Sequence, residues 1–298
     1  MRKRSRFAVI VVFGSINLDL IFRVPQLPVA GQTVASPAMR IEPGGKGANQ
    51  ALAAARDGAS VTFAGAVGDD RFAQDALGLM REAGIDLTRV ATTDAWTGCA
   101  SICVDDAGQN LIAVASGANL LARASQVEDT LLGPDTTLLL QMEVDPAETA
   151  TLVRRAKARG AYVILNLAPA AALPDDIWAS LDLLIANEEE AAWLGTHFGA
   201  EPATLRGTLG CDIAITLGAQ GVRAETDAGA LSLAARKIAV VDTTAAGDCF
   251  AGVLAAGLDR GLDLEQALRR ATVAAALCCT RPGTQTSLPT HAEIDAAQ

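Results

Sequence analysis

The sequence is poor in the side chains that build metal and redox sites. Only two of its 298 residues are histidines, and the six cysteines form no C-x-x-C pair. We therefore expect neither a zinc site nor a disulfide framework, and we expect reduced thiols, as in a cytoplasmic protein.

Long apolar runs and an excess of positive charge are also absent. The longest uncharged stretches, Val24–Met39 and Ala107–Ala122, have 16 residues each and contain polar side chains, so we expect no membrane span. With 24 Lys and Arg against 34 Asp and Glu, the net charge is −10, and nucleic acid is not an expected partner. The basic start and the apolar run after it look like a signal peptide. Because the run ends in Gly14 without the usual cleavage site, a buried strand is the better interpretation.

Short apolar runs alternate along the chain with stretches of helical period. This alternation predicts an α/β fold, in which helices cover a mostly parallel sheet. Since no repeat or linker interrupts it, residues 1–298 are expected to form a single domain. The strand-like runs are Phe7–Gly14, Val61–Val67, Thr137–Gln141, Tyr162–Asn166, Leu183–Ala186 and Asp212–Thr216, and the helical stretches include Gly47–Arg56, Arg71–Ala83, Pro146–Arg159, Gly247–Gly257 and Leu264–Cys279.

Two segments break this alternation. Leu18–Ile41 is rich in Val and Pro with little helical period, and Thr97–Ala115 has two strand-like runs around a turn at residues 105–108. We expect antiparallel strands here that project from the main sheet. They would form a small lid, to which residues 17–41 and 97–115 contribute.

A glycine-rich turn, residues 43–50, precedes the first helical stretch with the sequence Pro-Gly-Gly-Lys-Gly-Ala-Asn-Gln. It is not a Walker A loop, because Arg40 stands where the first Gly belongs and Gly47 replaces the Ser or Thr that would hold magnesium. The turn could simply cap a helix, or its backbone amides could bind an anion or hydroxyl groups. Lys46 and Asn49 in the same turn favour the second interpretation.

A second cluster, residues 242–252, follows the strand-like run Ile238–Val241 and opens a helix near Gly247. Small residues let a ligand approach closely, and a helix N-terminus stabilises charge on a phosphoryl group. Asp248 at this place could accept the proton of an attacking hydroxyl, or it could merely cap the helix. Both interpretations remain open from the residues alone.

Together, the two clusters resemble the two signatures of the ribokinase (PfkB) family of sugar and nucleoside kinases. Their order and separation match, and the likeness runs from about Phe7 to His291. It implies an α/β, ribokinase-like three-layer fold with a mostly parallel central sheet and a small β-strand lid. Further matching segments are Gly14–Asp19, Gln141–Glu143, Leu165–Ala170, Ala186–Glu190, Ile215–Gly221 and Thr280–Gly283.

The resemblance assigns catalytic and sugar-binding roles. Asp248 would be the general base, and the backbone amides of Ala245, Ala246 and Gly247 would form the anion hole. Carboxylate and amide groups suit the vicinal hydroxyls of a sugar. By similarity, the sugar would contact Asn17, Asp19, Gly45, Lys46, Asn49, Glu143 and Asp248.

The resemblance also implies sites for ATP and its cations. Asn187 and Glu190 would organise Mg²⁺ through water, although Glu188–Glu190 could be only an acidic first helical turn. ATP would lie on Asn187, Thr216, Gly218, Gly221, Gly247 and Thr272, where Thr272 replaces the His or Asn that ribokinases often place against adenine. A monovalent cation, expected to be K⁺, would lie at Asp242, Thr244, Cys278, Arg281, Gly283 and Ser287.

The implied reaction moves the γ-phosphoryl group of Mg·ATP to the primary hydroxyl of a pentose. D-Ribose to D-ribose 5-phosphate is the preferred interpretation, and a homodimer through the lid is expected. A nucleoside or deoxyribose kinase, or a sugar-binding protein without turnover, are the alternatives. Five further side chains receive no chemical role. We expect His197 to be a loop or core residue, Trp96, Trp178 and Trp193 to be packing residues, and Cys249 to lie on the first turn of its helix.

Overall fold

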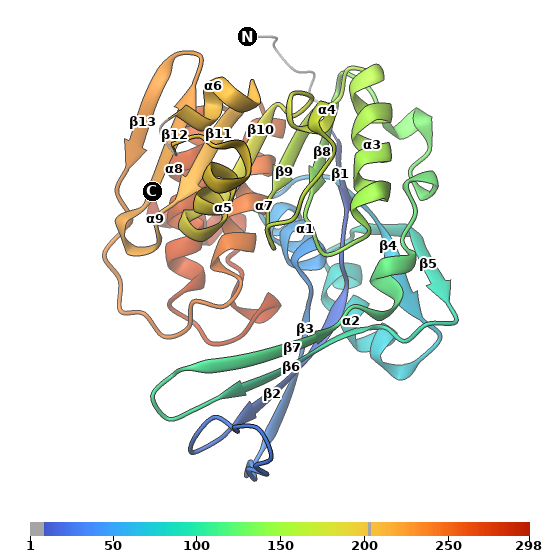
Figure 1. The fold of residues 1–298 in the computed structure, drawn as a ribbon, viewed down its shortest axis with the longest axis vertical. Coiled ribbons are helices and arrows are strands. Elements are labelled where there is room, and N and C mark those ends of the chain that lie inside the picture. Colours follow the sequence, from blue (N-terminus) through green and yellow to red (C-terminus); the bar gives the residue numbers. More distant parts are fainter. Residues whose placement is uncertain (1–8, 202–203) are drawn as a thin grey trace.

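The computed structural model describes residues 9–201 and 204–298, and it contains one large and one small sheet (Figure 1). Within these residues the large sheet has nine strands in the order β13-β12-β11-β10-β9-β8-β1-β4-β5, and neighbouring strands are parallel except that β12 is antiparallel to both β11 and β13. The strands are β1 (Val9–Phe13), β4 (Val61–Gly68), β5 (Asp86–Thr93), β8 (Thr136–Leu140), β9 (Tyr162–Asn166), β10 (Leu183–Asn187), β11 (Asp212–Thr216), β12 (Val222–Thr226) and β13 (Gly229–Leu233).

Helices cover both faces of the large sheet, as Figure 1 shows. Along β1, Ile10 and Val12 pack into one helical layer and Val11 and Phe13 into the other, which explains the uninterrupted apolar sequence of the strand. The layer on Ile10 contains α1 (Lys46–Arg56), α2 (Arg71–Glu82), α7 (Ala246–Asp259), α8 (Leu264–Cys278) and α9 (His291–Ala297). The opposite layer contains α3 (Pro146–Ala158), α4 (Asp175–Trp178), α5 (Glu188–Phe198) and α6 (Leu205–Leu209). The three-layer α/β fold class is thereby confirmed.

The small sheet extends away from the helical body (Figure 1). Its order is β3-β2-β6-β7, with β2 at Asn17–Arg23, β3 at Met39–Gly44, β6 at Gly98–Val104 and β7 at Asn110–Ala115. The outer pairs are antiparallel as expected, but the central pair β2 and β6 is parallel, which corrects the prediction. The reason is that β2 continues from β1 and β6 from β5, and these two strands run in the same direction in the large sheet.

Several local expectations are also corrected. No strand forms at Ile238–Val241, where Val240 and Val241 are exposed and the chain instead donates from Val241 N to Cys279 O at 2.9 Å. His197 is neither in a loop nor in the core, because α5 continues to Phe198 and leaves its imidazole exposed, stacked on Trp193. Trp96 does not pack inside, since it is 75% exposed.

Two other expectations, on Trp178 and on Cys249, hold. Trp178 is buried, and Cys249 lies on the first turn of α7. No helix within the described residues is long and apolar enough to cross a bilayer. The start of the first expected strand, residues 7–8, lies outside the described residues.

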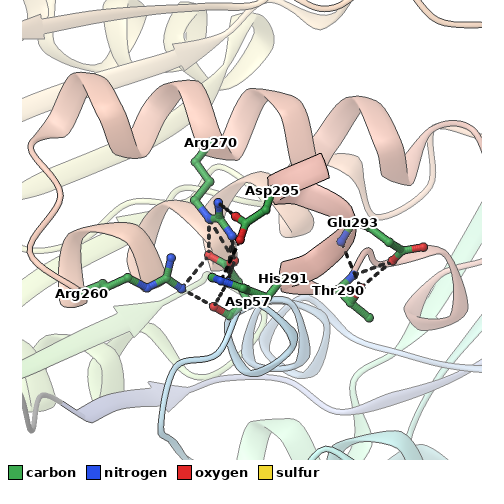
Figure 2. A network of polar contacts seen from close by, with 7 residues as sticks. All are labelled: Asp57, Arg260, Arg270, Thr290, His291, Glu293 and Asp295. Atoms are coloured by element: carbon green, nitrogen blue, oxygen red, sulfur yellow. Dashed lines mark hydrogen bonds and ion pairs between the residues drawn. The ribbon is translucent and has the colours of Figure 1, made fainter. Parts of the chain in front are cut away.

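A buried ionic network anchors the C-terminal end of α1 (Figure 2). Asp57 follows the last residue of α1 and is fully buried, and its carboxylate accepts from Arg270 Nε at 3.0 Å and pairs with Arg260 at 3.3 Å. Figure 2 shows both guanidinium groups and His291 gathered around Asp57, with Asp295 on the far side of Arg270. The network ties α1 to α7, α8 and α9.

Candidate active site

The candidate site begins where the N-termini of α1 and α7 meet. Gly252 on α7 lets the two helices pack closely, because a Cβ atom there would fall 2.3 Å from Gln50 O. This contact brings Asn49 and Gln50 of α1 against Asp248, in the first turn of α7. Residues about 200 positions apart thus form one cluster.

Asp248 is only 7% exposed, and its two carboxylate oxygens each accept one amide hydrogen bond. Asn49 Nδ2 donates to Oδ2 at 3.0 Å, and Gln50 Nε2 donates to Oδ1 at 2.9 Å. Asn49 Oδ1 is buried and has no hydrogen-bond partner among the described residues. A hydroxyl group entering the cluster could therefore donate to Asn49 or to Asp248.

Glu143 closes the N-terminus of α1 from the opposite side. Its Oε2 accepts from Ser15 Oγ at 2.6 Å and from Lys46 N at 3.0 Å, and Ser15 Oγ accepts from Gly47 N at 3.2 Å. A carboxylate is favourable at this end of a helix because unpaired N–H groups and the helix dipole point at it. The turn expected to bind hydroxyl groups or an anion thus has a carboxylate as its neighbour.

Asn17 lies at the start of β2 and is held by a side chain from a distant segment. Asn119 donates through Nδ2 to Asn17 Oδ1 at 2.8 Å, and it accepts from Ile16 N at 2.8 Å. Both amides are almost fully buried. Asn119 therefore fixes the orientation of Asn17.

Asp19 and Lys46 have opposite electrostatic surroundings. Burial, together with the nearby carboxylates of Glu143, Glu42 and Asp248, raises the pKa of Asp19 to about 7. The Asp248 carboxylate raises the pKa of Lys46, whereas burial opposes this shift. The site thus holds a carboxyl group that titrates near neutrality beside an ammonium group that stays charged.

The N-terminus of α7 opens into a cavity of about 160 Å³. Ala245, just before the helix, has a φ of 59°, a left-handed conformation that is costly for a residue with a Cβ atom. The N–H of Ala246 donates to Thr243 O at 3.2 Å, whereas the N–H of Gly247 meets no acceptor among the described residues. The residues that line the cavity are Lys46, Asn166, Ala168, Ile185, Ala186, Asn187, Glu190, Thr216, Thr243, Ala245, Ala246, Gly247 and Asp248.

A second cavity, of about 600 Å³, shares part of this lining. Thr216, Thr243, Ala246 and Gly247 line both, so the two cavities are neighbours. The second cavity includes Gly218, Gly221 and Thr272, so the structure brings together the positions expected to bind ATP. Thr272 Oγ1 donates to Leu268 O at 2.8 Å. Its hydroxyl proton is therefore committed to its own helix.

Asn187 and Glu190 form a capping box at the start of α5. Glu190 Oε2 accepts from Asn187 N, and Asn187 Oδ1 accepts from Glu190 N, each at 2.8 Å. The two side chains therefore cap the helix while they also line the smaller cavity. Glu190 Oε1 and Asn187 Nδ2 take no part in the capping box.

The six positions expected to hold a monovalent cation gather behind the N-terminus of α7. Asp242 accepts from Thr244 N at 2.9 Å and from Gly283 N at 3.1 Å. Cys278 Sγ lies 3.7 Å from Thr244 O and 3.1 Å from Ser287 Oγ. The Arg281 guanidinium pairs with Glu293 at 2.5 Å instead of simply facing solvent. Among the described residues, no three His, Cys, Asp or Glu side chains cluster as direct metal ligands.

Several residues at this site received no role from the sequence. Ser15, Gln50, Asn119, Gln141 and Asn166 all contact or line it. All except Asn119 lie within or beside a matched segment, but an amide or hydroxyl group carries no sign of its partner in the sequence. Their roles depend on contacts between segments far apart in the chain.

Comparison with known proteins places this geometry in a family. The pattern of the pfkB family carbohydrate kinases matches residues 8–291. The chain belongs to this family. It is therefore a phosphotransferase that acts on a sugar hydroxyl, and the enzyme class expected from the sequence is confirmed.

The relatives of this pfkB kinase cover nearly its whole length. The ribokinase of Haemophilus influenzae is 34% identical over 297 residues, 95% of this chain and 96% of the relative. The crystal structure of ribokinase from Thermotoga maritima has a TM-score of 0.90 and 33% identity, covering 97% of this chain and 99% of that chain. Arabidopsis thaliana ribokinase, solved with ribose and ATP, has a TM-score of 0.87 and 26% identity, covering 97% of this chain and 98% of that chain.

Proposed function

We propose that this protein phosphorylates the primary hydroxyl of D-ribose with ATP and forms D-ribose 5-phosphate. The observation that carries the proposal is the position of Asp248. Its carboxylate contacts Asn49, which has a buried, unpaired Oδ1, and it also lines the cavity at the N-terminus of α7. A sugar hydroxyl on one side and a phosphoryl group on the other would meet at this carboxylate. Relatives named ribokinase over nearly the full length support ribose as the sugar.

In the reaction, Asp248 accepts the proton of the ribose primary hydroxyl as the oxygen attacks the γ-phosphorus. The bond from the γ-phosphorus to the β,γ-bridging oxygen breaks, and ADP leaves. The N–H of Gly247 and the Lys46 ammonium stabilise the charge on the phosphoryl oxygens. The larger cavity, which Gly218 and Gly221 help to line, takes the nucleoside.

The residues at the start of α5 fit a hydrated magnesium ion. Both residues line the smaller cavity, and the second carboxylate oxygen of Glu190, outside the capping box, can accept a hydrogen bond from Mg²⁺-bound water. When bound with ATP, Mg²⁺ would neutralise phosphate charge. K⁺ would lie at the cluster around Asp242 and Thr244, whose backbone precedes Ala245 and can order the loop. Measuring the turnover rate at increasing concentrations of Na⁺ and of K⁺ tests this site.

Substrate assays separate the candidate activities. We expect ATP consumption to be fastest with ribose in a panel that also contains 2-deoxyribose, fructose, adenosine, cytidine and uridine. Preference for deoxyribose or a nucleoside would keep the fold and Asp248 but contradict the proposed substrate. Binding without turnover of any member would favour the non-catalytic alternative.

Exposed apolar side chains on the small sheet support a homodimer. Met39, Ile41, Leu111, Ile112 and Val114 are each about half exposed on β3 and β7. By the strand pairing, Met39, Ile41 and Leu111 lie on the face opposite Asp19, and a second copy that covered this face would remove their apolar surface from water. The six free cysteines support a reducing compartment, the cytoplasm.

A further inference from the structure

Two buried glutamines form a chain of hydrogen bonds that ends on Asp248. Gln50 Nε2 donates to Asp248 Oδ1 at 2.9 Å, and Gln141 Nε2 donates to Gln50 Oε1 at 2.8 Å. Gln141 follows β8, and Gln50 lies in α1, so the chain connects the large sheet to the base. Both side chains are fully buried.

The direction of this chain is set by the carboxylate. Ionised Asp248 only accepts hydrogen bonds, so Gln50 must present its NH₂ group to it and its oxygen to Gln141. Gln141 must then present its own NH₂ group to Gln50. Each amide is oriented by the next, and the dipoles of both point their positive ends toward Asp248.

In this orientation, Gln141 loses the chance to use its side-chain oxygen in the hydrogen bond to Gln50. Its Oε1 is buried and has no hydrogen-bond partner among the described residues, a situation that native proteins usually avoid. Gly14 leaves room for this oxygen, since a Cβ atom at position 14 would lie 1.9 Å from it. The unpaired oxygen is explained if the NH₂ end of Gln141 is needed at Gln50.

We infer that Gln50 and Gln141 are positioning residues for the general base, an inference that rests on the proposed function of Asp248. Gln50, together with Asn49, holds the carboxylate plane so that each oxygen keeps a lone pair for the sugar hydroxyl. Gln141 acts through Gln50 by fixing the orientation of its amide. Hydrogen bonds to the ionised form also favour a carboxylate that is ready to accept a proton.

A double-mutant cycle tests the coupling between the two amides. Gln50→Met is expected to lower kcat by about 10- to 100-fold, the effect of one hydrogen bond to a charged group, while ribose affinity stays within about threefold. Gln141→Met is expected to lower kcat by about 2- to 10-fold. The double variant should match Gln50→Met within about twofold, because Gln141 then has no amide to orient. Additive effects, or an unchanged kcat in Gln50→Met, would overturn the inference.

The pH profile separates positioning from general structural damage. In Gln50→Met, the acid limb of kcat at saturating ribose should move to higher pH, because the carboxylate has lost a donor. Gln126→Met is the matched control. Gln126 Nε2 donates to Gly65 O and to Arg89 O, each at 2.7 Å, and none of these residues lines either cavity. The control variant should lower thermal stability and leave both kcat and the acid limb unchanged. An acid limb that stays in place in Gln50→Met would contradict the proposed role.

A measurement without turnover keeps the inference separate from the proposed function. In NMR spectra, the side-chain NH₂ resonances of Gln141 should shift on Asp248→Asn, although the two residues do not touch. The shift should disappear when Gln50 is Met. Unmoved resonances refute the chain of hydrogen bonds whether or not the protein is a ribose kinase. If no member of the substrate panel is turned over, by contrast, that result refutes only the proposed function.

Discussion

Asp19 shows how burial sets the pH range in which a sugar site can work. Its pKa, raised by burial to about 7, lies well above the ordinary value of 3.8. Between these values the folded protein binds a proton that the unfolded chain does not. The contribution of Asp19 to the stability of the empty protein therefore falls as pH rises from about 4 to about 7.

We expect ribose affinity to increase with pH up to about 7 and to level off above it. Ribose hydroxyls donate to the ionised form of Asp19, and below its pKa this form decreases up to tenfold per pH unit. Calorimetric titration between about pH 5.5 and 8.5 measures this dependence. Asp19→Asn should bind ribose weakly with a much flatter profile. An equally steep profile in Asp19→Asn would assign the titration to another group.

Lys46 is expected to act on the transferred phosphoryl group as well as on the sugar. It lines the small cavity together with Asp248 and Gly247, and the carboxylate of Asp248 keeps it charged. Lys46→Met should lower kcat by about 10²- to 10³-fold, the usual cost of removing a charge-stabilising donor. Steady-state kinetics with ribose measure it, and Lys46→Arg should recover part of the loss. A change in ribose KM alone would limit Lys46 to sugar binding.

At the scale of single residues, the sequence points to those whose chemistry is distinctive. Asp248 and Lys46 could be found because an acid or a base at a helix start in a glycine-rich segment is informative. Gln50 and Gln141 could not, because the sequence does not show that two amides 91 residues apart touch.

Among the elements, α1 connects the site to the buried ionic network. Its first turn carries Lys46 and Asn49, and the residue after its last turn is Asp57. The two ends are about 16 Å apart at 1.5 Å per residue. The contribution of the network to the stability of the protein can therefore be tested separately from catalysis.

Asp57→Ala is expected to lower the free energy of unfolding by about 3–5 kcal/mol, because it leaves the buried Arg270 guanidinium without its main partner. Urea denaturation measures the change. The control, Glu265→Ala, removes an exposed partner of Arg269 and should cost less than about 1 kcal/mol. Equal losses in both variants would show that the buried network does not anchor α1.

Elements with a strong period were predictable, and edge elements were not. The apolar run of β1 and the helical period of α8 extend along the whole element, because other elements pack against each of them over its full length. Strand β5 lies at the sheet edge and mixes polar with apolar residues, so its sequence is ambiguous. Ile238–Val241 has the composition of a strand but pairs with no strand among the described residues.

For the whole molecule, the small sheet determines the expected assembly. Leu111 on β7 is 47% exposed and lies, by the strand pairing, on the face of the small sheet opposite Asp19. If a second copy covers it, Leu111→Glu should convert a dimer into a monomer, because a buried unpaired carboxylate is costly. Light scattering after gel filtration measures the mass. A monomeric wild type, or a dimeric Leu111→Glu, would contradict the dimer through this sheet.

The overall architecture followed from alternating strands and helices, but the connection between the two sheets did not. A sequence pattern shows that residues 17–41 and 97–115 contain strands, yet the parallel pairing of β2 with β6 follows from the direction of β1 and β5. Direction in a sheet is a property of the completed topology.

The most direct test of the account compares wild type with Asp248→Asn for ribose 5-phosphate formation from ribose and ATP. The account predicts formation of this product by the wild type and a kcat about 10²- to 10⁴-fold lower in the variant, with ribose affinity within a few fold. Gln126→Met, which removes an amide that lines neither cavity, serves as the control for a general loss of stability. A kcat that survives the substitution would contradict Asp248 as the general base, and a wild type that forms no ribose 5-phosphate would contradict the proposed function.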